Sequence, residues 1–173
     1  MMTTKLIISA NGPDRKGIVS EISSIISECH ANIETSKMIR LDKEFAMLIL
    51  IEIQTKAISK LHDSLNRIKN LSINLIETTS NNNLAAYEKK LHLYINGADN
   101  EGIVYKFSNY LSKLNINIEE INTKIKNAPI SATPLFMMDL IIDSEEDINQ
   151  KSIKKELDTI ADKLGVGIEI KKF

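Results

Sequence analysis

The sequence lacks a second cysteine, an excess of charge of either sign, and any long hydrophobic run. Its single cysteine, Cys29, cannot form an internal disulfide, which predicts a reducing compartment such as the cytoplasm. The 22 basic and 23 acidic residues leave a formal net charge of -1, so electrostatics do not favour nucleic acid or an anionic membrane. No stretch approaches about 18 apolar residues, so we expect no transmembrane helix. The apolar run near the N-terminus is too short for a signal peptide.

What the sequence does contain is an internal repeat. A shift of 85 residues places residues 12–34 on residues 97–119 with 10 identities in 23 positions and no gap. Chance would give roughly one or two identities for ordinary composition. The repeat and the length of 173 residues, 43% of them hydrophobic, indicate two small domains, each able to bury a core.

The two copies differ in length at one point. Phe45 matches Phe136 only with a shift of 91, so the second copy holds six extra residues in the segment "NAPISATP". A polar, Asn-rich segment separates the copies and is typical of a linker. We therefore predict a first domain at 1–80, a linker at 81–89 and a second domain at 90–173.

Each copy has the same order of hydrophobic patterns. Apolar residues at helical spacing follow the glycine turn and return near the end of each copy, and short apolar runs predict the strands. The order is β-α-β-β-α-β, which is the ferredoxin-like arrangement of the α+β class. We expect two such domains, each a four-stranded antiparallel sheet with two helices on one face. The predicted strands are 5–10, 32–40, 44–53 and 72–79 in the first copy and 90–95, 117–125, 134–143 and 166–173 in the second.

The third strand of the first copy is apolar on both of its faces. In 45–53, Ala46, Leu48 and Leu50 alternate with the other apolar residues. A sheet that is covered on one face only alternates apolar with polar residues. We therefore expect the second face to be covered as well, by the sibling copy around a pseudo-two-fold axis or by another chain.

The residues around the repeated turn resemble a known family. The order "GPDRKGIV" followed by "ANIE" is similar to that of ACT domains, which are small regulatory modules that bind amino acids. The second copy, with "GADNEGIVYKFSNYLSKLNINIEEINTK" and "APISATPLFMMDL", resembles the glycine cleavage system transcriptional repressor family, which has two ACT domains. Many ACT loops place proline just before the glycine, whereas this sequence has Lys16 and Glu101 there.

The chemistry of the turn suits a zwitterion. Glycine lets the chain leave the strand through backbone angles closed to other residues, which we expect of Gly12 and Gly97. Asp14 and Asp99 are placed to cap the following helix. A helix start that carries only a glycine side chain leaves its N–H groups open to a carboxylate, and a nearby aspartate accepts from an ammonium group. The same turn also fits capping alone, and both interpretations stay open.

The resemblance implies ligand contacts from the glycine loop and from the Asn that opens the second strand. For these Asn residues a second interpretation is a left-handed backbone at the loop exit, which Asn tolerates. The residues to which the resemblance carries a ligand-binding role are Asp14, Gly17, Ile18 and Asn32 in the first copy and Asp99, Gly102, Ile103 and Asn117 in the second.

Other candidate sites are weak. His30, His62 and His92 lack companions at metal-ligand spacing, so we expect no metal site. Cys29 falls on an apolar helical stripe and aligns with a leucine, which indicates a buried small hydrophobe rather than a nucleophile. The acidic stretch 143–150 is typical of a solvated start of a helix.

We therefore expect a non-catalytic regulator without a cofactor that senses a small amino acid such as glycine. The resemblance implies that it acts through a protein partner such as a transcriptional activator, without direct contact with nucleic acid or a membrane. The alternative is a regulatory subunit that modulates a separate enzyme of amino-acid metabolism. A catalytic protein is disfavoured because no cluster of titratable residues supports it. A homodimer is a further expectation.

Overall fold

The computed structural model describes residues 2–78, 90–128, 133–144 and 149–172. The chain divides into two compact units, Met1–Asn82 and Asn83–Phe173, and each has its own hydrophobic core. The linker predicted at 81–89 lies outside the described residues. Within the described ranges, no helix is both long and apolar enough to cross a membrane.

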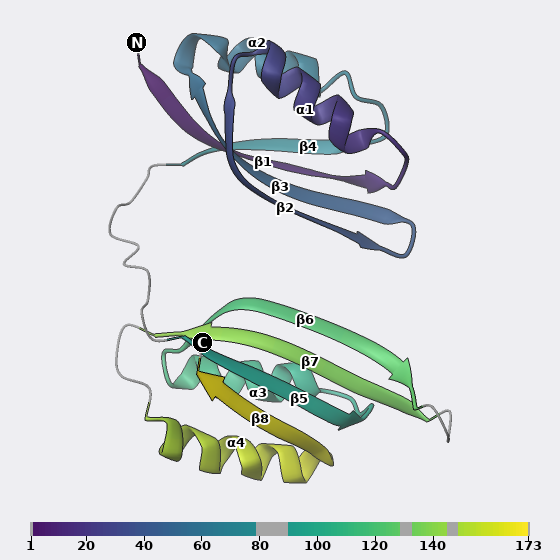
Figure 1. Ribbon diagram of the computed structural model, residues 1–173, viewed down its shortest axis with the longest axis vertical. Helices are drawn as coiled ribbons and strands as arrows, with labels where there is room; N and C mark the ends of the chain where they lie inside the picture. Colours follow the sequence, from purple (N-terminus) through teal and green to yellow (C-terminus); the bar gives the residue numbers. More distant parts are fainter. Residues whose placement is uncertain (1, 79–89, 129–132, 145–148, 173) are drawn as a thin grey trace. The chain divides into compact units, whose positions relative to one another are not determined.

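The first unit has the predicted order of strands and helices (Figure 1). A short 3-10 turn, Thr55–Ala57, precedes its second helix. Its elements are β1 (Thr3–Pro13), α1 (Ile18–Glu28), β2 (Asn32–Leu41), β3 (Glu44–Gln54), α2 (Ile58–Leu65) and β4 (Ser72–Thr78).

The second unit repeats this order, and its second helix is longer. In the hairpin that carries the extra residues, 129–132 lie outside the described residues, and the Ala128 N–H donates to the Thr133 carbonyl at 2.8 Å. The elements of the second unit are β5 (Leu91–Ala98), α3 (Ile103–Lys113), β6 (Asn117–Asn127), β7 (Pro134–Asp143), α4 (Gln150–Leu164) and β8 (Val166–Lys172).

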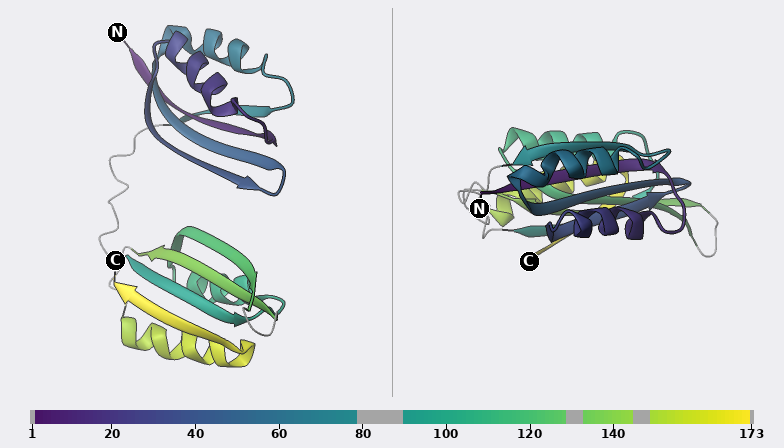
Figure 2. Two further views of the ribbon diagram at one scale, coloured as in Figure 1. Left: turned by 45° about the vertical axis from the view of Figure 1, so that its right-hand side comes forward. Right: turned by 90° about the horizontal axis from the view of Figure 1, so that it is seen from above.

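Both sheets have the same strand order. The order is β2-β3-β1-β4 in the first unit and β6-β7-β5-β8 in the second, and all pairs are antiparallel. The two helices of each unit lie on one face of its sheet (Figures 1 and 2). The prediction of two ferredoxin-like βαββαβ units is confirmed.

The sequence patterns explain why these elements form. Helix α1 buries Ile18, Ile22 and Ile26, which are spaced by one turn and face the sheet. Strand β3 buries every second residue from Phe45 to Ile53, as expected when one face of a strand lies under helices. Cys29 is buried in the same core with 4% exposure, which confirms its prediction as a small core residue.

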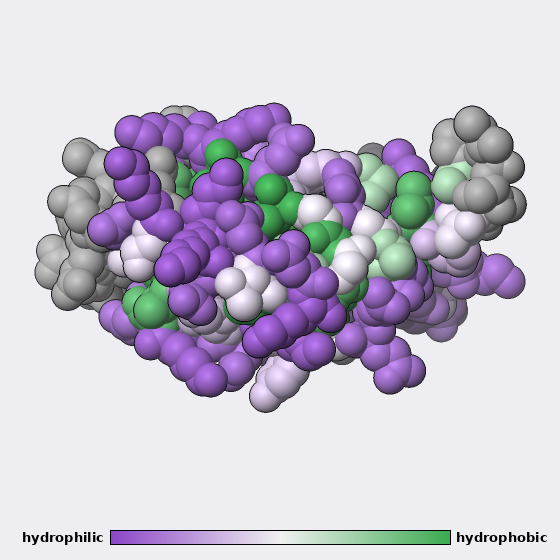
Figure 3. Space-filling view, turned by 90° about the horizontal axis from the view of Figure 1, so that it is seen from below, coloured by the Kyte–Doolittle hydropathy of each residue, from purple (hydrophilic) through white to green (hydrophobic). Residues whose placement is uncertain are grey.

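The surface of the molecule is mixed in polarity. Figure 3 views it from below Figure 1, the side on which α3 and α4 of the second unit lie, and hydrophilic residues surround smaller hydrophobic patches there. The sheet face of the first unit that points away from its helices has exposed apolar side chains: Leu48 is 55% exposed and Ile76 52%. The two described helices of that unit lie on the opposite face of the sheet (Figure 1), so the predicted cover from outside the unit stays a prediction.

Candidate functional site

The two glycine turns start their helices in the same way. Gly17 and Gly102 are the N-cap residues of α1 and α3, with left-handed φ angles of 90° and 80°. A Cβ on either glycine would meet nothing within 4 Å, so the space before each helix is open. Glycine is therefore needed there for its backbone conformation, because other residues are strained at such angles.

The prediction that Asp14 and Asp99 cap these helices is wrong. Neither helix has a side-chain cap hydrogen bond, because the glycine occupies the cap position three residues after each aspartate. The Asp14 N–H instead donates to the Lys43 carbonyl at 2.8 Å, and its carboxylate lies 3.7 Å from the Arg40 guanidinium. The N–H groups of the first helical turn are left without a side-chain acceptor.

The earlier glycines of the two turns differ. The prediction of backbone angles closed to other residues is confirmed for Gly12, whose φ is 157°, and is wrong for Gly97, which has no positive φ. A Cβ on Gly97 would lie 2.6 Å from the Cα of Val166, and one on Gly12 would lie 2.3 Å from the Asn70 carbonyl oxygen. Close approach of a neighbouring backbone is the reason shared by both.

Asn32 and Asn117 are the first residues of β2 and β6. The left-handed interpretation is wrong for both, because that conformation belongs to His30 and Asn115, two residues earlier, each with a φ of 54°. Each strand-opening Asn lies opposite an acidic residue of the next strand: Asn32 pairs with Glu52 and Asn117 with Asp143.

Within one unit, the helix separates the two halves of the predicted ligand set. The glycine turn precedes α1 or α3, and the Asn follows the other end of the same helix. A helix of 11 residues is about 16 Å long at 1.5 Å per residue. The structure therefore brings Asp99, Gly102 and Ile103 together at one end of α3, with Asn117 at the opposite end. The first unit has the same separation.

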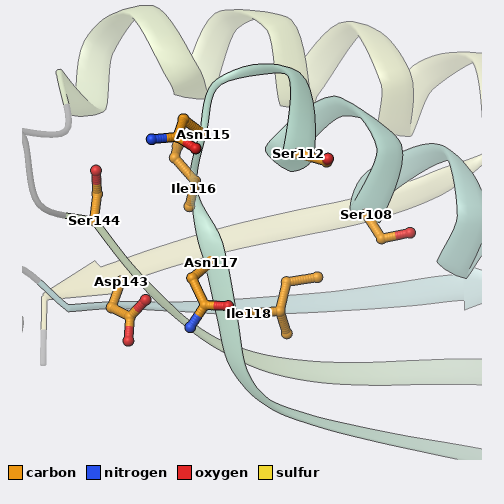
Figure 4. Close-up of a pocket in the computed structure, with 8 residues that line it drawn as sticks. All are labelled: Ser108, Ser112, Asn115, Ile116, Asn117, Ile118, Asp143 and Ser144. Atoms are coloured by element: carbon orange, nitrogen blue, oxygen red, sulfur yellow. The ribbon is translucent and has the colours of Figure 1, made fainter. Parts of the chain in front are cut away.

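A cavity of about 580 Å³ lies at the Asn117 end of the second unit (Figure 4). It is formed by the last turns of α3, the start of β6 and the end of β7. Hydroxyl and amide groups dominate its lining, with one carboxylate and two isoleucines. The lining residues are Ser108, Ser112, Asn115, Ile116, Asn117, Ile118, Asp143 and Ser144.

The carboxylate of this cavity is buried. Asp143 is only 4% exposed and is the one buried polar or charged residue among those described. Among the residues that the structure describes, none forms a hydrogen bond with its Oδ1 atom, and its side chain lies beside that of Asn117 (Figure 4). A buried carboxylate oxygen without a partner is energetically unfavourable, and such groups often mark places where a ligand or water binds.

The burial of Asp143 differs from the prediction of a solvated acidic stretch at 143–150. The shift of 91 that aligns the third strands places Asp143 on Glu52, and this alignment is the signal that was available. In the first unit that position is satisfied differently, because the Thr3 hydroxyl donates to Glu52 at 2.8 Å.

A β-bulge follows the strand-opening Asn in both units. The register shifts between Ile33 and Thr35 and again between Ile118 and Glu120. The extra residue is a glutamate in each case. It contacts a lysine at the matching repeat position, which lies in β1 in the first unit and directly before β5 in the second. The pairs are Lys5–Glu34 at 2.7 Å and Lys90–Glu119 at 2.6 Å. The repeat therefore keeps the local geometry that sets the position of the Asn.

The remaining titratable side chains do not gather into a second site of that kind. In the described part of the chain, no three His, Cys, Asp or Glu residues are placed to hold a metal ion. His92 contacts Asp139 at 2.6 Å on the sheet face away from the helices. Another cavity of about 430 Å³ lies beside this pair, and Tyr94, Lys124 and Lys126 contribute to its lining.

Comparison with known proteins gives a consistent result. A family model described as "ACT domain" matches residues 4–75. The glycine cleavage system transcriptional repressor of Escherichia coli (strain K12) is 26% identical over 126 residues, which cover 71% of this chain. The matched part spans 66% of that relative's length.

Two further comparisons extend over one or both units. A UPF0237 protein of Methanopyrus kandleri is 36% identical over 66 residues, which cover 37% of this chain and 73% of that protein. The crystal structure of an unknown protein from Galdieria sulphuraria has a TM-score of 0.84 and 26% identity, with 99% of both chains covered. The tandem arrangement of two such units is thus found in another solved structure.

Proposed function

The first unit belongs to the ACT-domain family, and from that premise we propose that the chain senses a small amino acid such as glycine and signals to a protein partner. It is an ACT-domain regulatory protein related to the glycine cleavage system transcriptional repressor. The finer proposal is that amino-acid binding controls its contact with a transcriptional activator.

The observation that carries this proposal is the open helix start that both units share. Gly17 and Gly102 leave the first N–H groups of α1 and α3 without a side-chain cap and with free space before them. Such N–H groups and the positive end of the helix dipole favour a carboxylate. An α-amino acid provides one. The proposed ligand-binding residues are Asp14, Gly17, Ile18, Asn32, Asp99, Gly102, Ile103 and Asn117.

The charge of the chain supports a protein partner over DNA. The formal net charge of -1 provides no basic excess, whereas neutralisation of phosphates dominates the affinity of DNA-binding proteins. The named relative that aligns with most of this chain is a transcriptional repressor. We therefore propose that any effect on transcription passes through another protein.

Titration calorimetry of the full chain against the free amino acids tests the sensing step. We expect saturable binding of a small amino acid, with Gly17→Val and Gly102→Val each weakening it. The control is Lys16→Ala, which changes an exposed neighbour of the glycine. Absence of binding by every amino acid would contradict the proposal.

Affinity purification from the native cell, with and without the amino acid that binds, tests the partner. A transcriptional activator whose recovery depends on that amino acid supports the proposal. Recovery of an enzyme of amino-acid metabolism in its place would replace the proposal with a regulatory subunit of that enzyme.

A further inference from the structure

We propose that the cavity beside Asn117 binds a primary ammonium group and that the Asp143 carboxylate is its counter-ion. The inference deepens the proposed function and rests on it only for the identification of the amine as an amino acid. The ammonium site belongs to the second unit and is separate from the glycine turn of that unit.

The burial of Asp143 is the first argument. The residue is 4% exposed, and its Oδ1 atom has no partner in the described part of the chain. Removing a carboxylate from water without a compensating partner costs free energy, which a cation with N–H donors offsets. An ammonium group brings three such donors and a positive charge.

The other residues that line the cavity favour a ligand with a positive charge. No Lys or Arg is among the described residues that line the cavity, so an anionic ligand would meet Asp143 there without a compensating cation. The Ser108 hydroxyl donates to the Tyr105 carbonyl at 3.2 Å, which leaves its oxygen lone pairs as acceptors. The Asn117 amide lies in the same lining, with its nitrogen on the side of Asp143 and its oxygen on the side of Ile118 (Figure 4). A group with several donors is therefore favoured.

Size and position complete the argument. A volume of about 580 Å³ falls within the range of about 300–1,000 Å³ typical of small-molecule sites. The cavity lies at the C-terminal end of α3, about 16 Å from the glycine turn by the helix rise. That distance exceeds the length of a small amino acid, so one ligand does not contact both places within this unit.

The first unit provides a matched control. Glu52 stands where the second unit has Asp143, and it lies opposite Asn32 as Asp143 lies opposite Asn117. Its carboxylate already accepts the Thr3 hydroxyl at 2.8 Å, and it is partly exposed. The requirement for an external cation is therefore specific to the second unit.

The experiment follows amide signals of the full-length protein by NMR during titrations with four probes: ethanolamine, glycine, glycolate and calcium chloride. Ethanolamine and glycine carry an ammonium group, whereas glycolate is glycine with a hydroxyl in its place. We expect the two amines to shift the Asn117 and Asp143 signals and glycolate to leave them unchanged. Calcium that produces the same shifts and displaces ethanolamine at equal concentration would overturn the proposal in favour of an inorganic cation site.

Variants assign the effect to residues. Asp143→Asn is expected to weaken ethanolamine binding tenfold or more, while Glu52→Gln binds as the unchanged protein does. Asn117→Lys places an ammonium group of the protein beside Asp143, so it should abolish amine binding and raise the melting temperature. This second variant keeps the test valid if Asp143→Asn does not fold. Unweakened binding of ethanolamine by folded Asp143→Asn or Asn117→Lys would overturn the proposal.

The same data separate this inference from the proposed function. If an amino acid and ethanolamine both bind folded Asp143→Asn with unchanged affinity, amino-acid sensing stands and the ammonium site is wrong. If ethanolamine binds in an Asp143-dependent way and no amino acid binds the protein, the ammonium site stands and the sensing proposal fails.

Discussion

In the first unit Asn32 lies opposite Glu52, and in the second Asn117 lies opposite Asp143. The backbone around these pairs is the same, including the bulge and its lysine–glutamate pair. The acids differ in their surroundings: Glu52 accepts a hydroxyl, whereas Asp143 is buried with one oxygen unpartnered. The comparison teaches that the repeat keeps the same backbone scaffold while the second copy has an unsatisfied buried carboxylate, where we propose that a ligand binds.

The sheet faces that point away from the helices also differ between the two units. In the first unit Ile39, Leu48 and Ile76 are exposed on that face. In the second unit His92 and Asp139 form a polar pair there. Each unit has a complete core of its own, so this divergence does not affect the packing under the helices.

The largest expected effect concerns the two cores. Phe107 in the second unit and Ile22 in the first occupy matching positions, and both are 0% exposed. Phe107→Ala is expected to cost about 3–5 kcal/mol of the second unit's unfolding free energy, and Ile22→Ala about 2–5 kcal/mol of the first's. Urea denaturation followed by NMR signals from each unit measures both.

Because the cores are separate, each change should act on its own unit. The exposed neighbour Lys106→Ala serves as the control, with an expected effect within about 0.5 kcal/mol. Equal destabilisation of both units by Phe107→Ala would mean that the two cores unfold as one and would break the comparison.

The helix starts should respond equally in the two units. Gly17→Val and Gly102→Val each place a β-branched residue at a left-handed φ, which costs about 1–3 kcal/mol of unfolding free energy. The matched changes to Asn should cost less, because Asn adopts this conformation more readily. Thermal unfolding of the four variants measures the difference. Valine and asparagine variants of equal stability would show that the left-handed angle does not persist in solution.

The starts of these helices also show which features a local sequence pattern predicts and which it does not. The helical spacing of Ile18, Ile22 and Ile26 predicts α1 because its signal is local. The cap does not follow in the same way: Asp14 and Gly17 are both common near helix starts, and only the backbone angles decide which of them occupies the cap.

Asp143 could not be placed from its neighbours because its burial depends on a partner distant in sequence. The acidic residues that follow it indicate solvent, whereas pairing of β7 with β6 places it opposite Asn117. The ligand role of the glycine turns and of the two Asn residues stays a prediction. It depends on a bound molecule, whose identity no hydrophobic pattern encodes.

A smaller effect sharpens the comparison of the acids. Thr3→Val removes the hydroxyl that donates to Glu52 and leaves its carboxylate without that partner, as Asp143 is without one. The loss of one largely exposed hydrogen bond is expected to cost about 0.5–1 kcal/mol of the first unit's unfolding free energy. Chemical denaturation of Thr3→Val beside Thr3→Ser, which keeps the hydroxyl, measures it. If both variants lose the same stability, the hydrogen bond contributes nothing and Glu52 does not need Thr3.

The smallest expected effect is a pH dependence confined to the second unit. Tyr110 packs against the second core, whereas the matching residue of the first unit, Ile25, does not titrate. Burial raises the pKa of the Tyr110 phenol, and the negative charge of Glu156 raises it further. The folded state therefore favours the protonated phenol. The resulting stability is fully present below the unfolded pKa of about 10 and is lost as the pH rises through the folded pKa.

Absorbance titration of the phenols in the intact protein and in Tyr110→Phe isolates this group from the other three tyrosines by difference. The difference curve should have its midpoint above that of an exposed tyrosine, and Glu156→Gln should move it partway back. Denaturation of the second unit at increasing alkaline pH should then show a slightly smaller loss of stability in Tyr110→Phe than in the intact protein, with the first unit unchanged. Lysines titrate in the same range in both proteins, so their contribution cancels in this comparison. A difference curve with the midpoint of an exposed tyrosine would show that the phenol is not desolvated by its contact with the core.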